Sequence, residues 1–195
     1  MKKILVAVSG GVDSIVLVDF LIDFFKQKNG LKWVEDNLII AHFEHGIRGE
    51  ESVQDLEFVR KFANKNNLRF EFKRGFLGEN ASEEKARKAR YDFLKALAKR
   101  ENAEIFTAHH KNDLAETFVL NLNRGGGWRA IACFDSPNIK RPFLKFSKAE
   151  IFNKAQEKGL KWCEDSTNLS EKYARNRIRK KINFSEENLN EIFEI

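Results

Sequence analysis

Ser9-Gly10-Gly11-Val12-Asp13-Ser14 lies between two apolar runs near the start of the chain. The run before it, Ile4 to Val8, is short and rich in β-branched residues, which predicts a buried strand. In the run after it, Ile15 to Phe25, apolar residues recur at helical spacing, which predicts a helix. A strand, a glycine turn and a helix in this order direct backbone N–H groups toward an anion. The hexapeptide therefore predicts a pyrophosphate site and, with it, nucleotide chemistry.

The residue types of the hexapeptide exclude two common kinds of phosphate-binding loop. The hexapeptide lacks the lysine of a Walker A loop and the three spaced glycines of a dinucleotide fold. Its serines can donate hydroxyl hydrogen bonds to phosphate, while its glycines leave room for a close approach. Asp13 would repel phosphate unless a cation lay between them, which predicts Mg²⁺ here. The alternative is an ordinary glycine-rich turn in which Asp13 favours the helix N-terminus.

Composition excludes several classes of protein. With 195 residues, 42% hydrophobic and 33% charged, the chain is long enough for one α/β domain and is neither disordered nor membrane-spanning. The first apolar run ends too early for a signal peptide, so we expect a cytoplasmic protein. The two cysteines, Cys133 and Cys163, lie far apart in the sequence and predict reduced thiols.

The net charge is +6, and basic residues crowd in 172–181. Such a basic segment indicates binding to nucleic acid or, alternatively, a solvated helix face.

Strands and helices alternate along the rest of the chain. Further strands are predicted at 38–43, 68–72 and 104–107, and further helices at 51–66, 82–99, 113–123 and 147–158. Residues 140–144 are predicted to be extended, with Pro142 excluding a central strand position. The order predicts a doubly wound, mainly parallel sheet with helices on both faces. We expect a catalytic domain at 1–182 and a short tail at 183–195, a helical turn or a frayed end.

Polar residues follow three of the predicted strands, at 9–14, 42–51 and 107–116. Ligands bind outside the carboxyl ends of the strands in such sheets, so these clusters should converge. Residues 42–51 are dense in His, Arg and acids, which permits a metal site or a surface loop. Asp113 and Glu116, one helical turn apart and next to His109 and His110, could hold a cationic substrate or Mg²⁺. The alternative is a capping box at the start of that helix.

Two groups of arginines complete the candidate residues. Arg87 and Arg90 share one helical face, where their guanidinium groups suit phosphate or a developing oxyanion. The alternative is a charged helix face paired with Glu84. Arg175 and Arg179 lie one turn apart in the basic segment and could grip an RNA backbone.

The hexapeptide SGGVDS resembles the PP-loop of the ATP pyrophosphatases, which split ATP between the α and β phosphates and adenylate a substrate oxygen. Five further stretches share one more specific resemblance. They are HFEHGIRGEES, EEKARKARYDFL, TAHHKNDLAETFVLNLNRGGG, RPFL and WCEDSTNLSEKYARNRIR. Together with the hexapeptide they resemble the N-terminal domain of the tRNA(Ile)-lysidine synthetases from Ile4 to Ile182. Many members of that family carry further C-terminal domains.

This resemblance implies a ligase. ATP would adenylate O2 of the wobble cytidine (position 34) of tRNA(Ile) with a CAU anticodon, releasing pyrophosphate. The ε-amine of L-lysine would then attack C2 and expel AMP, leaving lysidine and changing codon reading from AUG to AUA. ATP, Mg²⁺ and L-lysine are the implied cofactors and co-substrate, and a homodimer is the implied assembly.

The resemblance also implies residue roles. The ATP pyrophosphate would be bound by Ser9, Gly10, Gly11, Val12, Asp13 and Ser14, with Asp13 also the Mg²⁺ ligand. The residues implied in catalysis are Asp13, Arg87, His110, Asp113, Glu116, Arg175 and Arg179. The residues implied in binding lysine or supporting the substrate are Asp113, Glu116, Asn168 and Asn176. The adenine would stack near Val8, Ala41 and Phe43.

Two other functions stay open. A tRNA thiolase of the same superfamily would need paired cysteines for persulfide or iron–sulfur chemistry, and the two cysteines have no such spacing. The second alternative is a catalytically inactive module that binds a nucleotide or RNA. Such a module would not need every polar cluster of the catalyst, and this sequence contains all of them.

Overall fold

The computed structural model describes residues 2–46, 50–76, 78, 81–123, 125, 138–164, 177–178, 182 and 184–194. The strands are β1 (Lys3–Ala7), β2 (Leu38–Glu44), β3 (Arg69–Arg74), β4 (Ala103–Phe106) and β5 (Ile139–Lys140). The helices are α1 (Val12–Asn29), α2 (Leu31–Asn37), α3 (Glu50–Lys65), α4 (Glu83–Glu101), α5 (Lys111–Asn123), α6 (Lys148–Glu157) and α8 (Glu186–Glu194), with a 3₁₀ helix η2 (Pro142–Lys145).

The strands form one parallel sheet in the order β3-β2-β1-β4-β5. The chain moves outward from β1 through β2 to β3 and then returns to place β4 on the other side of β1. The strand order therefore reverses beside β1, and in sheets of this kind ligands bind at the carboxyl ends of the strands at such a point. This topology confirms the predicted doubly wound sheet.

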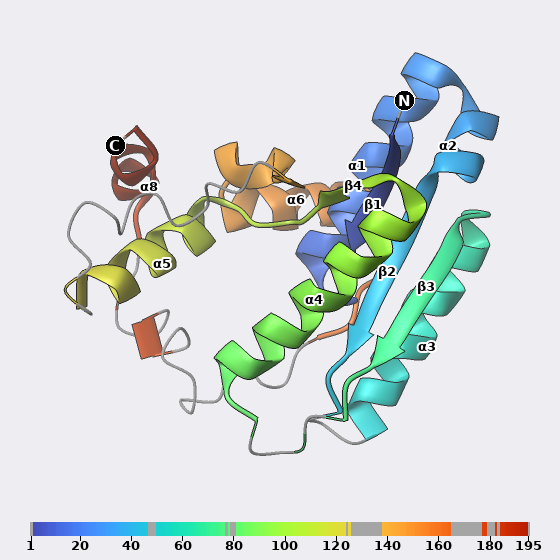
Figure 1. Ribbon diagram of the computed structural model, residues 1–195. Helices are drawn as coiled ribbons and strands as arrows, with labels where there is room; N and C mark the ends of the chain where they lie inside the picture. Colours follow the sequence, from blue (N-terminus) through green and yellow to red (C-terminus); the bar gives the residue numbers. More distant parts are fainter. Residues whose placement is uncertain are drawn as a thin grey trace.

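Helices cover both faces of the sheet (Figure 1). One apolar cluster joins the sheet to α1, α3 and α6 through residues such as Ile15, Val59 and Ile151. A second cluster joins the other face to α4 through Leu94 and Leu97. β2 is buried at every position, as expected for a strand between two helical layers. α5 and α8 lie side by side away from the sheet, where Lys111 donates a 2.6 Å hydrogen bond to Asn190.

Several predicted boundaries are confirmed. The Ser82 hydroxyl accepts a hydrogen bond from the Lys85 amide at 3.2 Å and caps α4. Ser147 caps α6 in a complete capping box with Glu150. Because a capping box satisfies two N–H groups reciprocally, it fixes where α6 starts.

Three expectations differ from the structure. The short helix α2 was missed; it starts directly after Gly30, whose φ of 87° turns the chain out of α1. The prediction of an extended 140–144 was wrong beyond Lys140, because Pro142 occupies the first position of η2, where its fixed φ is favourable. The segment expected to be a turn or frayed end contains α8, whose Leu189 is buried against α5.

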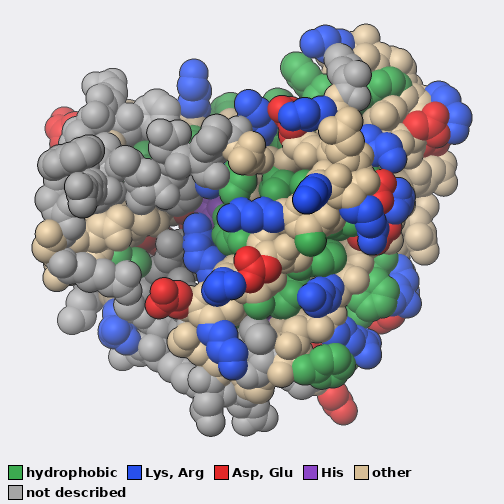
Figure 2. Space-filling view, viewed as in Figure 1, with side chains coloured by type: hydrophobic (Ala, Val, Ile, Leu, Met, Phe, Trp, Pro, Cys, Tyr) green, Lys and Arg blue, Asp and Glu red, His purple; other side chains and the backbone are tan. Residues whose placement is uncertain are grey.

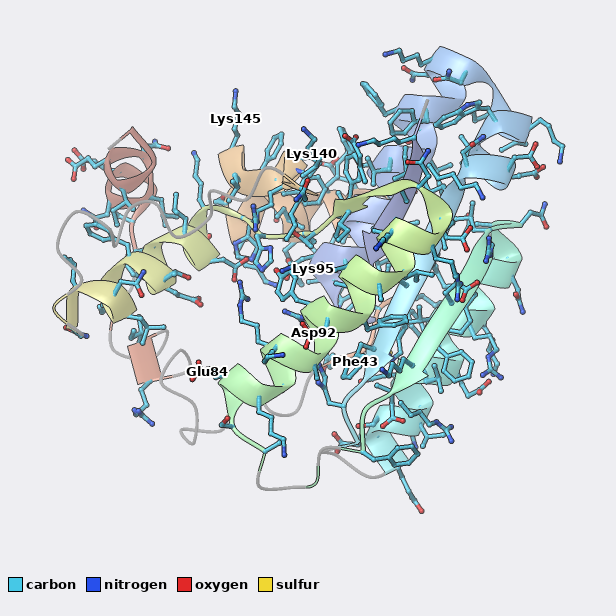
Figure 3. All side chains as sticks on the ribbon, viewed as in Figure 1. Phe43, Glu84, Asp92, Lys95, Lys140 and Lys145 are labelled. Atoms are coloured by element: carbon cyan, nitrogen blue, oxygen red, sulfur yellow. The ribbon has the colours of Figure 1, made fainter. Side chains whose placement is uncertain are left out.

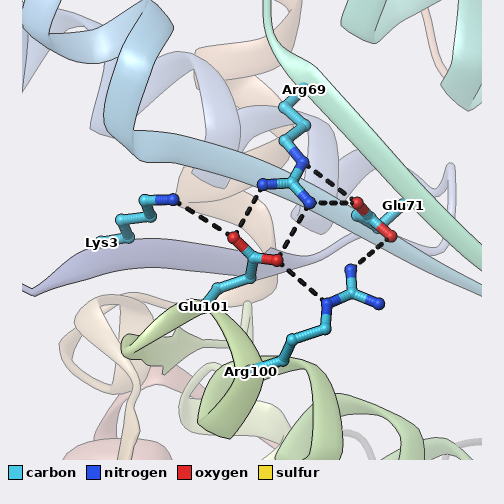
Figure 4. A network of polar contacts seen from close by, with 5 residues as sticks. All are labelled: Lys3, Arg69, Glu71, Arg100 and Glu101. Carbon is cyan, nitrogen blue, oxygen red and sulfur yellow. Dashed lines mark hydrogen bonds and ion pairs between the residues drawn. The ribbon is translucent and has the colours of Figure 1, made fainter.

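The amino ends of the strands carry an ion-pair network (Figure 4). Glu101, at the end of α4, accepts hydrogen bonds from Lys3, Arg69 and Arg100 at 2.7–3.2 Å. Glu71 of β3 pairs with the same two arginines. The network therefore ties the first residue of β1, the start of β3 and the end of α4 together.

No helix in the described part of the chain has the length and apolar character needed to cross a membrane.

Candidate active site

The hexapeptide forms a tight loop between β1 and α1. Gly10 has a φ of 102°, a conformation that glycine adopts without strain. The Ser14 hydroxyl donates to the Gly11 carbonyl at 2.8 Å and accepts from the Gly10 amide at 3.3 Å, so it braces the loop from inside. Gly11 is the N-cap of α1 and provides no capping side chain. An uncapped helix N-terminus behind a glycine turn is suited to binding a phosphate group.

Neighbouring segments hold this loop from two sides. The buried His42 ring of β2 makes a 2.8 Å hydrogen bond to the Val8 carbonyl through Nδ1. On the other side, the Cys163 amide donates to the Gly10 carbonyl at 2.9 Å. A Cβ added at Gly10 would lie 3.4 Å from Val59 of α3. The loop conformation is thus set by tertiary contacts as well as by its own glycines.

Asp13 makes its strongest contact with a residue that the sequence did not identify. Lys148, the first residue of α6, donates to both carboxylate oxygens of Asp13 at 2.7 and 2.8 Å. The backbone of Lys148 is held in turn, because its amide donates to Asn112 of α5 at 2.8 Å. The starts of α1, α5 and α6 therefore meet at Asp13.

The 107–116 segment brings further polar groups to the same place. His110 is buried, with its Nε2 3.8 Å from an oxygen of Asp13 and 3.5 Å from an oxygen of Asp113. Its amide donates to Asp113 at 3.0 Å. α5 begins at Lys111, so Asp113 is the acid of the first turn and the predicted start at Asp113 was two residues late. Glu116, one turn further along α5, is only 2% exposed.

The predicted arginines of α4 gather near the same segment. Arg87 and Arg90 lie over the Tyr91 ring, 4.8 and 5.5 Å from its centroid. Burial lowers the pKa of His109 to about 3, Asp113 opposes that shift, and the charges of Arg90, Arg87 and Arg141 add to it. His109 is consequently neutral at pH 7, and its Nδ1 is 2.8 Å from the Thr107 hydroxyl. Arg141, directly after β5, was not identified individually from the sequence.

The surface around α4 is rich in basic side chains. Figure 2 shows lysine and arginine side chains spread over α4, and a histidine at the bottom of a hollow flanked by basic groups. Lys95 lies on α4, and Lys140 and Lys145 lie above that helix in the view of Figure 3. Positive charge on this face favours a polyanionic ligand.

The donor set at Asp13 fits Mg²⁺ of the kind bound together with nucleotide. No group of three or more His, Cys, Asp or Glu residues is arranged to hold a metal within the described residues. Mg²⁺ in phosphate-transfer sites needs only one or two carboxylates, because phosphate oxygens and water complete the octahedron. Asp13 supplies a carboxylate of that kind next to the loop, and Asp113 lies on the other side of His110.

The structure brings together most, but not all, of the predicted site residues. Asp13 of the PP-loop, His110 and Asp113 converge at the carboxyl edge beside β1, and Glu116 is buried one turn further along α5. Four predicted residues, Asn168, Arg175, Asn176 and Arg179, lie outside the described residues.

The expected adenine neighbours do not share one surface. Val8 packs in the core cluster of α1, Ala41 packs in that of α4, and Phe43 is 7% exposed. The Phe43 ring lies 5.9 Å from Phe93 of α4, beneath the helix in Figure 3. The adenine site near these strand ends, with hydrogen bonds to the backbone, stays a prediction.

Comparison with known proteins agrees with this architecture. The profile of a family described as the PP-loop domain matches residues 1–186. A tRNA(Ile)-lysidine synthase of Thermotoga sp. (strain RQ2) is 40% identical over 190 residues, covering 93% of this chain and 44% of that protein. The enzyme of the same name from Rickettsia bellii (strain OSU 85-389) is 34% identical over 191 residues, covering 93% and 43%. The chain thus spans less than half the length of these curated relatives.

A solved structure shares the fold at low sequence identity. It is a U34-tRNA thiolase from Methanococcus maripaludis with its 4Fe-4S cluster, and it superposes with a TM-score of 0.76 at 18% identity. The match covers 99% of this chain and 70% of that one. At this identity the likeness shows the fold alone, because one fold hosts many reactions.

Proposed function

The chain belongs to the family of PP-loop domains, and from this premise we propose that it is the ATP-dependent catalytic domain of a tRNA(Ile)-lysidine synthase. The observation that carries the proposal is the 34–40% identity to such enzymes over 93% or more of the chain. The convergence of the PP-loop with His110 and Asp113 at one edge of the sheet supports it. A tRNA substrate also agrees with the positive charge over α4, and the cytoplasmic location stays a prediction.

In the first step, O2 of the wobble cytidine of tRNA(Ile) attacks the α-phosphorus of ATP. The bond between the α-phosphorus and the bridging oxygen breaks, and pyrophosphate leaves. The loop amides and the Ser9 hydroxyl hold the pyrophosphate in line, while the Ser14 hydroxyl braces the loop from inside. Arg87 and Arg90 face the charge that develops on the phosphoryl oxygens. Bound Mg²⁺, held by Asp13 and the phosphates, would neutralise part of that charge.

In the second step, the ε-amine of L-lysine attacks C2 of the adenylated cytidine. The bound ε-ammonium first gives a proton to a base, and the free amine then attacks. The C2–O2 bond breaks, AMP departs with the oxygen, and the new C2–N centre releases its second proton to solvent. Asp113 and Glu116 hold the cationic lysine, because two carboxylates one turn apart on α5 present acceptors to the same side. Four further residues stay predicted members of this site, namely Asn168, Arg175, Asn176 and Arg179. The homodimer also stays a prediction.

The thiolase alternative rests on the shared fold. A 4Fe-4S cluster needs three or four cysteine ligands, whereas this chain has two cysteines. Cys163, the one within the described part, lies against Gly10. The chain therefore lacks the ligands for that cluster.

One experiment tests the proposal directly. The protein is incubated with ATP, radiolabelled L-lysine and a tRNA(Ile) transcript with a CAU anticodon. Label retained in the RNA, together with equimolar AMP and pyrophosphate, is expected. ATP binding without label transfer would favour the inactive binding module, and sulfur incorporation from a persulfide donor would favour the thiolase.

A further inference from the structure

The ion pair between Asp13 and Lys148 conflicts with the role proposed for Asp13. Both oxygens of the carboxylate that would bind Mg²⁺ are engaged by one ammonium group, at 2.7 and 2.8 Å. A divalent ion and that ammonium compete for the same two oxygens. When nucleotide and Mg²⁺ bind, the ammonium must therefore release Asp13, and the nearest new anion is the phosphate chain.

The position of Lys148 is unfavourable for helix stability. It is the first residue of α6, where the helix dipole is positive and a cation is repelled. A second lysine, Lys158, lies just beyond the other end of α6, where a cation is favoured, and pairs with Asp19 and Asp23 of α1. The two lysines make similar bridges from α6 to α1, but only Lys148 does so against the dipole and at the PP-loop.

The surroundings of Lys148 fix its backbone and leave its side chain free to move. Ser147 and Glu150 form the capping box with hydrogen bonds of 2.7 and 3.3 Å, and Asn112 binds the Lys148 amide. The side chain itself is 45% exposed. A lysine ammonium on a flexible stem can swing between two anions without any movement of α6.

We propose that Lys148 is a positioning residue that occupies Asp13 in the nucleotide-free protein and turns to the ATP phosphates when Mg²⁺ takes Asp13. This inference rests on the proposed function only in that ATP binds at the PP-loop. In the free protein, the ammonium keeps the Asp13 charge neutralised beside the loop amides. In the complex, the same ammonium supplies a phosphate contact that a Walker A loop obtains from its own lysine.

The test uses binding, not turnover. Mn²⁺, followed by electron paramagnetic resonance, reports occupancy of Asp13 without nucleotide, and a non-hydrolysable ATP analogue at saturating Mg²⁺ reports the phosphate contact by calorimetry. Lys148→Met should bind Mn²⁺ about two- to fivefold more tightly, because its competitor is removed. The same variant should bind the analogue about tenfold more weakly, because one charged contact is lost.

Two controls make the result specific. Lys158→Met removes the parallel bridge between α6 and α1 and should change neither affinity. Lys148→Arg keeps the charge and should restore analogue binding while Mn²⁺ binding stays weak. Unchanged or weaker Mn²⁺ binding in a folded Lys148→Met protein would overturn the proposal. A failure of lysine transfer to tRNA would overturn the proposed function alone, since neither binding measurement depends on that step.

Discussion

The two edges of the sheet use the same kinds of charged residue in different ways. At the amino edge, Glu101 and Glu71 are each held by several cations, and hydrogen bonds, first from Arg69, lower the pKa of Glu101 to about 2. At the carboxyl edge, Asp13 pairs with the half-exposed side chain of Lys148 and lies 3.8 Å from Nε2 of His110. The first arrangement is complete without a ligand, whereas the second keeps its acids within reach of a substrate. Charge at the amino edge thus serves the fold, and charge at the carboxyl edge is where we propose that substrate binds.

The largest expected effect is on the carboxyl edge. Asp13→Ala should lower pyrophosphate release by about 100-fold or more, because it removes the carboxylate proposed to hold the metal against the phosphates. The matched control is Asp19→Ala, which breaks the other aspartate–lysine bridge from α1 to α6. Rates are measured by coupled pyrophosphate detection with saturating tRNA. Wild-type release from Asp13→Ala would contradict the role given to Asp13.

A second substitution separates the two half-reactions. Asp113→Asn should raise the KM for lysine about tenfold or more, because the carboxylate proposed to hold the ε-ammonium becomes neutral. The amide oxygen of Asn can still accept from the His110 amide, so α5 should keep its start. Lysine-independent pyrophosphate release should stay near the wild-type rate. If pyrophosphate release fell while the lysine KM did not change, Asp113 would belong to the ATP half of the site.

The pH dependence of stability distinguishes the two edges. The pKa of His109 is lowered from 6.5 to about 3, so between these values the unfolded chain binds a proton that the native protein does not. Stability should therefore fall as the pH drops below 6.5, by at most about 1.4 kcal/mol per unit for this group. The same sign holds for Glu101, but its window opens only below 4.5.

Urea unfolding between pH 4.5 and 6.5 checks this separation. His109→Asn should flatten the pH dependence in that window, whereas Glu101→Gln should leave it unchanged. Identical slopes in wild type and His109→Asn would mean that His109 is protonated normally in the folded protein.

The smallest effect is expected at the amino edge. Glu101→Gln should cost about 1–2 kcal/mol at pH 7, because the side chain loses its charge-assisted hydrogen bonds but keeps an amide oxygen as an acceptor. Its pyrophosphate release should match the wild type. A loss of activity comparable with that of Asp13→Ala would remove the distinction between the two edges.

Local patterns were sufficient for much of the fold. Strand β2 was predicted from its apolar run and α6 from its Ser147 cap, because both depend on residues close together in the chain. η2 was missed because Pro142 suits both an extended edge and the first residue of a helical turn. The short α2 was missed because seven residues contain too few turns to show a helical period.

The sequence by itself determined the loop chemistry, the alternation of strands and helices, and the acids of the 107–116 segment. These follow from neighbouring residues, whose spacing sets which side chains share a turn or a face. Only the tertiary structure decided that Lys148 binds Asp13, since 135 residues separate them along the chain. The tertiary structure also decided that three arginines lie near His109. It decided as well that the ion-pair network of Glu101 and Glu71 lies at the opposite edge of the sheet. Such contacts depend on how the helices pack against the sheet, which no local pattern encodes.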